Sequence, residues 1–99
     1  MKRGTTPTIA LTLEGIDFAF IDKAELTIVQ HNEKKLIKQL KINVEKCGMY
    51  TVLNQLETLS LEAGKCTLQV KILFIDGSVI ATDAMTFNVQ EILNDEVIV

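Results

Sequence analysis

The chain has 99 residues, of which 47% are hydrophobic and 23% charged, and its formal net charge is −3. This length fits a single domain over residues 1–99, because two cores would both be too small to be stable. The acidic balance argues against nucleic acid as a partner, since neutralising phosphates requires a basic surface. No apolar stretch approaches the roughly 18 residues that cross a bilayer, so we expect no membrane span and no signal peptide.

Composition also narrows the chemistry. Aromatic residues make up 5% of the chain and Trp is missing, which removes the usual stacking platform for carbohydrate or nucleic acid. His31 is the lone histidine, and with Cys47 and Cys66 it offers too few ligands for zinc; we expect both cysteines to be reduced and to act as small apolar fillers. Phosphate loops, dinucleotide fingerprints and nucleophile elbows are missing. We therefore expect no metal, no cofactor, no small-molecule substrate and no enzymatic activity.

In the first part of the chain, apolar and polar residues mostly alternate, which is the two-residue period of a strand. Thr8–Glu14 alternates apolar and polar residues and predicts a half-buried strand that Pro7 opens. Gly15–Asp22 is too apolar for a free linker, so we expect it to cross over the core. Ala24–Gln30 predicts a second strand, and residues 31–33 predict the turn after it.

The next run, Lys35–Glu45, allows two interpretations. Leu36, Leu40, Ile42 and Val44 stand at even positions, and a strand is favoured because Ile42 and Val44 continue this two-residue period. Leu36, Ile37 and Leu40 also fit helical spacing, and a helix is the alternative.

A turn at residues 47–48 and a short strand over Met49–Leu53 follow. Asn54 and Glu57 then have the spacing of a capping box, in which each side chain bonds to the backbone of the other residue. The sequence therefore predicts one short helical turn near residues 55–60.

The strongest signal is a hairpin over residues 64–90, where two apolar-alternating runs flank the dipeptide Asp76-Gly77. Asp and Gly adopt the positive backbone angles of a tight turn at low cost. A two-residue loop places Ile75 opposite Ser78. In that register one face of the hairpin forms a continuous core layer of Cys66, Leu68, Val70, Ile72, Phe74, Val79, Ala81, Met85 and Phe87.

Asp83 does not fit this core layer. It shares the parity of the core positions, and an unpaired buried carboxylate costs several kcal/mol. We expect a bulge near Thr82-Asp83 that turns the carboxylate outward. A functional carboxylate is the alternative, although the sequence offers it no partner.

The opposite face of the hairpin carries Leu73, Ile75 and Ile80, and these three residues are the candidate interaction surface. Each contributes roughly 1.5 to 3 kcal/mol when fully buried, whereas association costs an estimated 4 to 15 kcal/mol. The patch therefore suits a larger interface or a protein displayed in many copies. In the alternative, the N-terminal strand or the Ile16–Ile21 segment covers it. The apolar segment Glu91–Val99 is expected to lie on its own sheet, with docking onto a partner as the other possibility.

About seven short strands with regular turn signals predict an all-β fold, an immunoglobulin-like antiparallel β-sandwich. Four stretches of the sequence are similar to a family of small prophage-encoded proteins, which resemble the immunoglobulin-like domains of phage tail and baseplate proteins. These stretches are Lys2–Thr8, Leu56–Lys65, Asp76-Gly77 with Ala81-Thr82-Asp83, and Val89–Leu93. The matching motifs are structural, so no catalytic or binding residue is transferred.

The resemblance implies a non-catalytic structural protein of the phage tail or baseplate. Its partners would be other phage structural proteins or further copies of itself, first in the host bacterial cytoplasm and then in the virion. The alternative is an immunoglobulin-like module that recognises a carbohydrate or a cell-surface molecule, which the low aromatic content disfavours.

Overall fold

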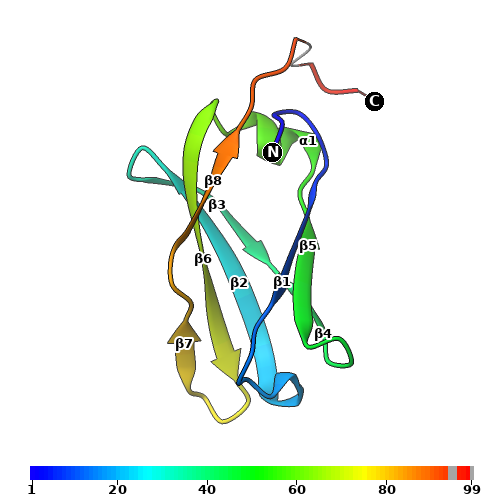
Figure 1. The fold of residues 1–99 in the computed structure, drawn as a ribbon, viewed down its shortest axis with the longest axis vertical. Coiled ribbons are helices and arrows are strands. Elements are labelled where there is room, and N and C mark those ends of the chain that lie inside the picture. Colours follow the sequence, from blue (N-terminus) through cyan, green and yellow to red (C-terminus); the bar gives the residue numbers. More distant parts are fainter. Residues whose placement is uncertain (94–95, 99) are drawn as a thin grey trace.

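The computed structural model describes residues 1–93 and 96–98, and that part of the chain forms two antiparallel sheets packed as a sandwich (Figure 1). The all-β sandwich predicted from the sequence is confirmed. In chain order the elements are β1 (Thr8–Thr12), the 3-10 helix η1 (Phe18–Phe20), β2 (Ile21–Gln30), β3 (Glu33–Gln39), β4 (Lys41–Asn43), β5 (Gly48–Val52), α1 (Gln55–Leu59), β6 (Gly64–Phe74), β7 (Val79–Ala81) and β8 (Met85–Val89).

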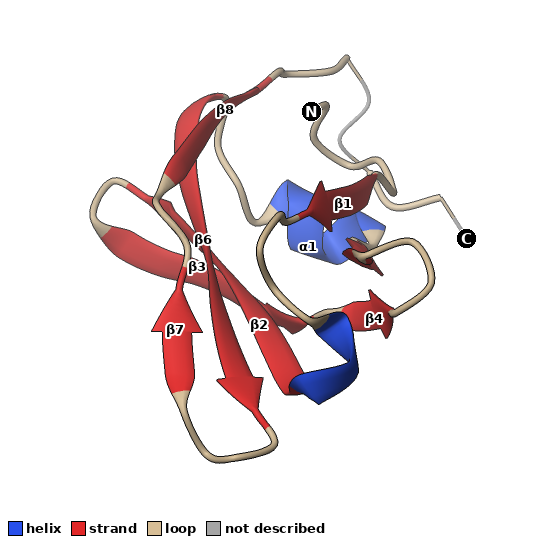
Figure 2. Cartoon of the chain, turned by 60° about the horizontal axis from the view of Figure 1, so that its bottom comes forward, coloured by secondary structure: helices blue, strands red, loops and turns tan. Residues whose placement is uncertain are grey.

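The small sheet has the strand order β1-β5-β4, and the large sheet has the order β3-β2-β6, with both β7 and β8 paired to the far side of β6. In Figure 2 the strands of the large sheet lie together on one side of the molecule, and β1 and β4 lie on the other. Neither helix in the described residues is long and apolar enough to cross a membrane.

The core lies between the two sheets, where the inward positions of β2 and β6 alternate with exposed ones. Its main side chains are Phe18, Ala24, Leu26, Ile28, Leu40, Met49, Leu53, Leu61, Cys66, Leu68, Val70 and Ile72. Cys66 is the small core filler that the sequence predicts, and burial raises the pKa of its thiol. The same expectation is wrong for Cys47, which is exposed at a turn with φ 49°. Both thiols are free.

Residues 35–39 and 41–43 of the segment Lys35–Glu45 form strands, as favoured, but they do not form a single strand, and residues 44 and 45 lie in a turn. The segment divides at Leu40 into β3, which pairs with β2 in the large sheet, and β4, which pairs with β5 in the small sheet. Leu40 is buried at the crossing, and its backbone N–H donates to the Ala24 carbonyl (2.8 Å). The two-residue period continues through both strands, so the sequence pattern gives no sign of the break.

The hairpin forms, but its register beside the loop differs from the prediction by one residue. Leu73 lies opposite Val79. The Phe74 N–H donates to the Ser78 carbonyl, and the Gly77 N–H donates to the Phe74 carbonyl, so three residues and not two form the loop. Val79 and Ala81 therefore face outward and are exposed, and their assignment to the core layer is wrong. The assignment of Met85 is wrong too, because this residue begins β8 and is exposed.

The predicted bulge is confirmed and restores the expected register. The Thr82 N–H donates to the Val70 carbonyl (2.9 Å), whereas Met85 already lies opposite Leu68. Residues 83 and 84 thus face a single residue of β6, which is the definition of a bulge. Asp83 is exposed, so its carboxylate does not enter the core.

The remaining local predictions concern turns and the helix. His31 and Asn32 have φ values of 54° and 60° and make the β2–β3 turn. The capping box is confirmed, because the Glu57 N–H donates to Asn54 Oδ1 (2.8 Å) and the Asn54 N–H donates to Glu57 Oε1 (2.9 Å).

The C-terminal segment Glu91–Val99 includes residues 94, 95 and 99, which lie outside the described residues. Its described part does not add a strand to either sheet. Ile98 exchanges two hydrogen bonds with the side chain of Gln55 on α1, and Leu93 is fully exposed.

Candidate functional site

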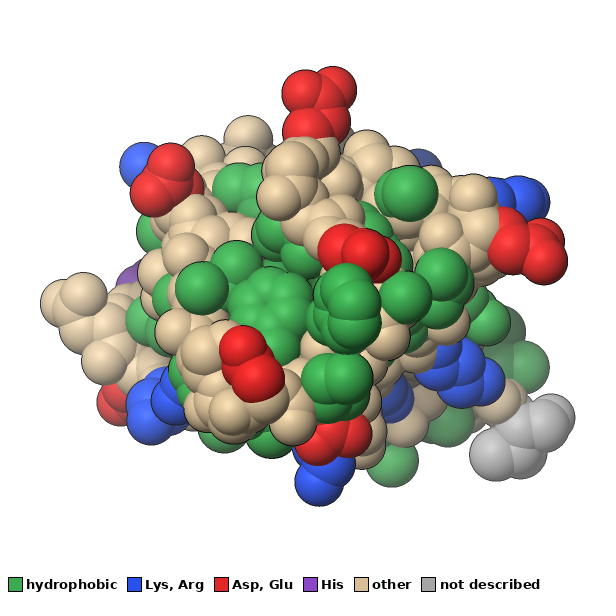
Figure 3. All heavy atoms as spheres, turned by 90° about the horizontal axis from the view of Figure 1, so that it is seen from below, with side chains coloured by type: hydrophobic (Ala, Val, Ile, Leu, Met, Phe, Trp, Pro, Cys, Tyr) green, Lys and Arg blue, Asp and Glu red, His purple; other side chains and the backbone are tan. Residues whose placement is uncertain are grey.

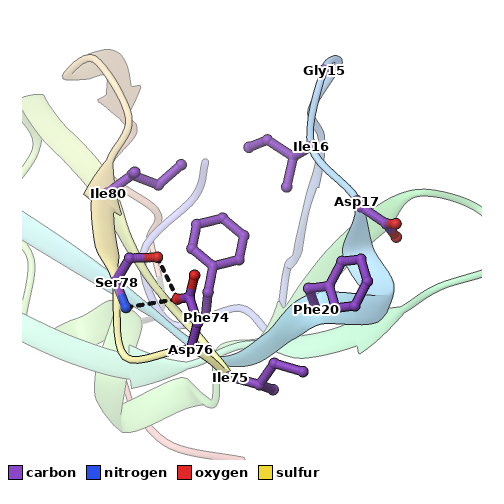
Figure 4. A pocket seen from close by; sticks show the side chains of 9 residues that line it. All are labelled: Gly15, Ile16, Asp17, Phe20, Phe74, Ile75, Asp76, Ser78 and Ile80. Carbon is purple, nitrogen blue, oxygen red and sulfur yellow. Dashed lines mark hydrogen bonds between the residues drawn. The ribbon is translucent and has the colours of Figure 1, made fainter.

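The strongest candidate site is a hollow of about 450 Å³ at the end of the sandwich that carries η1 and the β6–β7 loop (Figure 4). We call this region the apolar end. It is lined by Gly15, Ile16, Asp17, Phe20, Phe74, Ile75, Asp76, Ser78 and Ile80.

One wall is built by η1. Asp17 caps this helix, because its Oδ1 accepts a hydrogen bond from the Ala19 N–H (3.0 Å). Phe18 inserts into the core and is 2% exposed. Phe20, two residues later, points out of the core and is 54% exposed. Burial of the first aromatic ring thus fixes the second at the surface.

The other wall is the β6–β7 loop. Asp76 Oδ1 accepts hydrogen bonds from the backbone N–H (2.8 Å) and the hydroxyl (2.6 Å) of Ser78. Gly77, at φ +89°, supplies the left-handed residue that the loop needs. The Ile75 N–H donates to the Phe20 carbonyl (2.9 Å). This backbone bond holds the two walls together.

Three large apolar side chains of this end are exposed and line the same hollow. Ile75 is 64% exposed and Ile80 is 41% exposed, beside the exposed ring of Phe20. Figure 3 shows hydrophobic side chains gathered around an aromatic ring, with acidic side chains at the border. Single exposed aliphatic residues are ordinary in folded proteins, whereas a contiguous group is a candidate contact surface.

The polar part of the lining is acidic. The hydrogen bonds from the Ser78 side chain and backbone lower the pKa of Asp76, so this carboxylate is charged at neutral pH. Asp17 stands on the opposite wall (Figure 4). None of the described residues that line the hollow is Lys, Arg or His.

The structure brings together two of the three residues predicted as an interaction surface. Ile75 and Ile80 line the apolar end, whereas Leu73 lies opposite Val79 and lines a separate hollow of about 250 Å³. The shifted hairpin register causes this separation. The Ile16–Ile21 segment forms a wall of the apolar end and leaves Ile75 and Ile80 exposed.

Sequence reasoning did not place Phe20, Phe74 or the two carboxylates at this surface. A signal existed for one wall, since Asp17 before an apolar pair is typical of a helix cap. The proximity of residues 17–20 to residues 74–80 depends on the tertiary fold.

Chemically, the apolar end offers hydrophobic surface and carboxylates. His31 lies elsewhere, with its Nε2 2.9 Å from Glu62 Oε2, and both side chains are exposed. Within residues 1–93 and 96–98, no group of three or more His, Cys, Asp or Glu side chains is placed to hold a metal ion.

The edges of the sheets are a second candidate for contact with a partner, because their outer backbone groups are free to pair. β3 is an edge of the large sheet and carries Lys34, Lys35 and Lys38, which discourage pairing with another strand. β1 is an edge of the small sheet and has no charged residue in its sequence TIALT.

Comparison with known proteins gives no matching family model and no matching curated protein. Solved structures do match. The cycloalternan-degrading enzyme from Trueperella pyogenes aligns with a TM-score of 0.64 at 13% identity, over 90% of this chain and 11% of the enzyme. The same enzyme in complex with isomaltose aligns with a TM-score of 0.64 at 15% identity. CopC from Methylosinus trichosporium OB3b aligns with a TM-score of 0.60 at 14% identity, over 94% of this chain and 85% of CopC.

These similarities support the immunoglobulin-like β-sandwich and concern the fold alone, because one sandwich architecture carries many unrelated functions. The chain spans about a tenth of the length of the enzyme that it matches.

Proposed function

We propose that this protein is a non-enzymatic interaction module that binds a partner protein through its apolar end, as a structural component of a phage tail or baseplate. The observation that carries the proposal is the grouping of exposed Phe20, Ile75 and Ile80 around one hollow. Complete burial of a fully exposed side chain of this kind contributes roughly 1.5 to 3 kcal/mol, and these partly exposed side chains contribute a fraction of that each.

The phage context rests on the sequence resemblance described above. A tail displays many copies of its components around a symmetry axis, and multivalency raises the effective concentration of each further contact. A single modest patch then suffices, although association of two free proteins costs an estimated 4 to 15 kcal/mol. Edge strands such as β1 offer additional contacts by strand pairing.

The test combines gene context with binding. We expect portal, tape-measure or baseplate genes beside this gene. The purified full-length chain is then mixed with the proteins that these neighbouring genes encode, and complexes are measured by sedimentation velocity. We expect a complex with at least one of them, and we expect Ile75→Asp/Ile80→Asp to abolish it, because two carboxylates would enter a desolvated contact.

The matched control is Ile37→Asp, which introduces the same carboxylate at a side chain that is 55% exposed on the edge strand β3. The control variant should bind as the wild type does. Binding that survives Ile75→Asp/Ile80→Asp would contradict the role of the apolar end. A monomer that binds no neighbouring protein but binds glycans on an array would contradict the proposed function itself.

A further inference from the structure

We infer that the apolar end takes a linear segment of its partner in which one large apolar side chain is flanked by Lys or Arg. The inference rests on the proposed function and names the chemistry of the partner. It is carried by the charge of the lining together with the shape of the hollow.

The shape fits a side chain better than a flat protein face. The hollow of about 450 Å³ has apolar walls on both sides, with Phe20 on η1 and Ile80 on β7, and Phe74 between them (Figure 4). Apolar walls favour an apolar group at the centre of the contact, where water is excluded.

The charges at the border select the flanking residues. Asp17 and Asp76 stand on opposite walls, and no described basic residue lines the hollow. Each carboxylate uses Oδ1 for a hydrogen bond within its own turn, which fixes the position of the charge. The Asp17 carboxylate points away from the centre of the hollow (Figure 4), so its charge lies at the border. A segment that inserts an apolar side chain brings its neighbouring side chains toward this border. Lys or Arg gains attraction there, and Asp or Glu meets repulsion.

The same charges decide against a second copy docked end to end. Two apolar ends related by a twofold axis would bring four carboxylates together without a cation in either lining. Like charges facing each other across an interface disfavour the pairing. A basic-apolar segment of another protein is therefore the occupant that the charges favour.

The experiment uses three synthetic peptides of one design, Ser-Gly-X-Phe-X-Gly-Ser, in which X is Lys, Ser or Glu. Each is titrated into the isotopically labelled full-length chain, and binding is followed by the shifts of backbone amide resonances. We expect the Lys peptide to shift the amides of Phe20, Ile75 and Ile80 at millimolar or lower concentration. We expect its affinity to exceed that of the Glu peptide at least fivefold at low salt, and this ratio to fall as salt rises.

The matched variant is Asp17→Asn/Asp76→Asn, in which the amide oxygens still accept the turn hydrogen bonds. It should fold as the wild type does and should reduce the Lys-to-Glu ratio to below twofold. Equal binding of the three peptides, a ratio that the variant leaves unchanged, or no shifts with any peptide would overturn the inference. Equal binding that Ile75→Asp/Ile80→Asp abolishes would overturn the charge preference while leaving the proposed contact surface in place.

Discussion

The sandwich has one end that carries α1 and another, the apolar end, that carries η1 and the β6–β7 loop (Figure 1), and the two ends are closed in different ways. At the end that carries α1, polar side chains reach inward and bond to backbone groups. Arg3 donates through Nη2 to the Leu59 carbonyl (2.9 Å) and through Nε to the Leu61 carbonyl (2.5 Å). At the apolar end, the large hydrophobic side chains of Phe20, Ile75 and Ile80 surround an open hollow. Leu56 on α1 is exposed as well, so the two ends differ in the hollow and in the polar contacts, not in exposed apolar side chains as such.

The α1 end closes through two further contacts. The buried Gln30 side chain bonds to both the N–H (2.8 Å) and the carbonyl (2.7 Å) of Glu62. The buried Thr58 hydroxyl donates to the Thr5 carbonyl (2.8 Å). The sequence thus contains residues suited to sealing one end of the sandwich, while the other end keeps an apolar opening. We expect the first end to govern stability and the second to govern binding.

The largest effect on stability should come from Gln30→Ala. The side chain is 2% exposed, and its loss leaves two backbone groups of Glu62 without their partners in addition to a cavity. We expect the free energy of unfolding to fall by about 2 to 4 kcal/mol, measured by urea denaturation. A loss of less than about 0.5 kcal/mol, the range of ordinary surface substitutions, would contradict the sealing role of Gln30.

Arg3→Ala should follow, with a loss of about 2 kcal/mol, because hydrogen bonds from a charged donor to two carbonyls disappear. Arg3→Lys is the matched control. Lysine keeps the charge but cannot reach both carbonyls at once, so the stability of Arg3→Lys should lie between that of the wild type and that of Arg3→Ala. If Arg3→Ala were as stable as the wild type in urea, the hydrogen bonds from Arg3 to the two carbonyls would not contribute to the stability of the fold.

Glu57→Gln tests whether the charge of the α1 capping residue stabilises the fold, through the pH dependence of the free energy of unfolding. Burial alone would raise the pKa of Glu57, but hydrogen bonds from Lys38 (2.7 Å) and the Asn54 N–H, with the Lys38 charge, outweigh it and lower the pKa below 4.5. The folded state then holds its proton less tightly than the unfolded state, so this stabilisation is present above pH 4.5 and is lost as pH falls through the lowered pKa. We expect Glu57→Gln to cost about 1 kcal/mol at pH 7.

That difference from the wild type should shrink below pH 4.5 in urea titrations at several pH values. If the difference in free energy of unfolding stays constant between pH 7 and pH 3, the charge of Glu57 does not stabilise the fold.

The smallest effect on stability should come from Phe20→Ser/Ile80→Ser at the apolar end. Both side chains are exposed, so the free energy of unfolding should change by less than about 1 kcal/mol. Partner binding should nevertheless be lost. A large drop in the thermal midpoint would mean that these residues support the fold, and the contrast between the two ends would disappear.

Local chemistry predicts much of this fold but little of the candidate site. Three kinds of feature follow from neighbouring residues, and the structure has them all. They are the capping box, the strands β1 and β2, and the bulge at Asp83. The hairpin register near Asp76-Gly77 does not follow, because this dipeptide serves loops of two or three residues.

The sheet change at Leu40 and the apolar end depend on contacts between distant parts of the chain. Leu40 fits the two-residue period of both β3 and β4, so the period does not show where the chain passes from one sheet to the other. At that point the Leu40 N–H donates to the Ala24 carbonyl of β2. Phe20 and Ile75 meet through one backbone hydrogen bond between segments far apart in sequence. Periodicity within each segment carries no information about that meeting.

The central claim is that the apolar end touches a partner, and site-specific photo-cross-linking tests it most directly. A benzophenone amino acid replaces Phe20 in the protein produced in its natural host cells, and replaces Ile37 as the matched exposed control. We predict that position 20 cross-links to one defined protein and that position 37 does not. Cross-linking from position 37 with none from position 20 would contradict the claim.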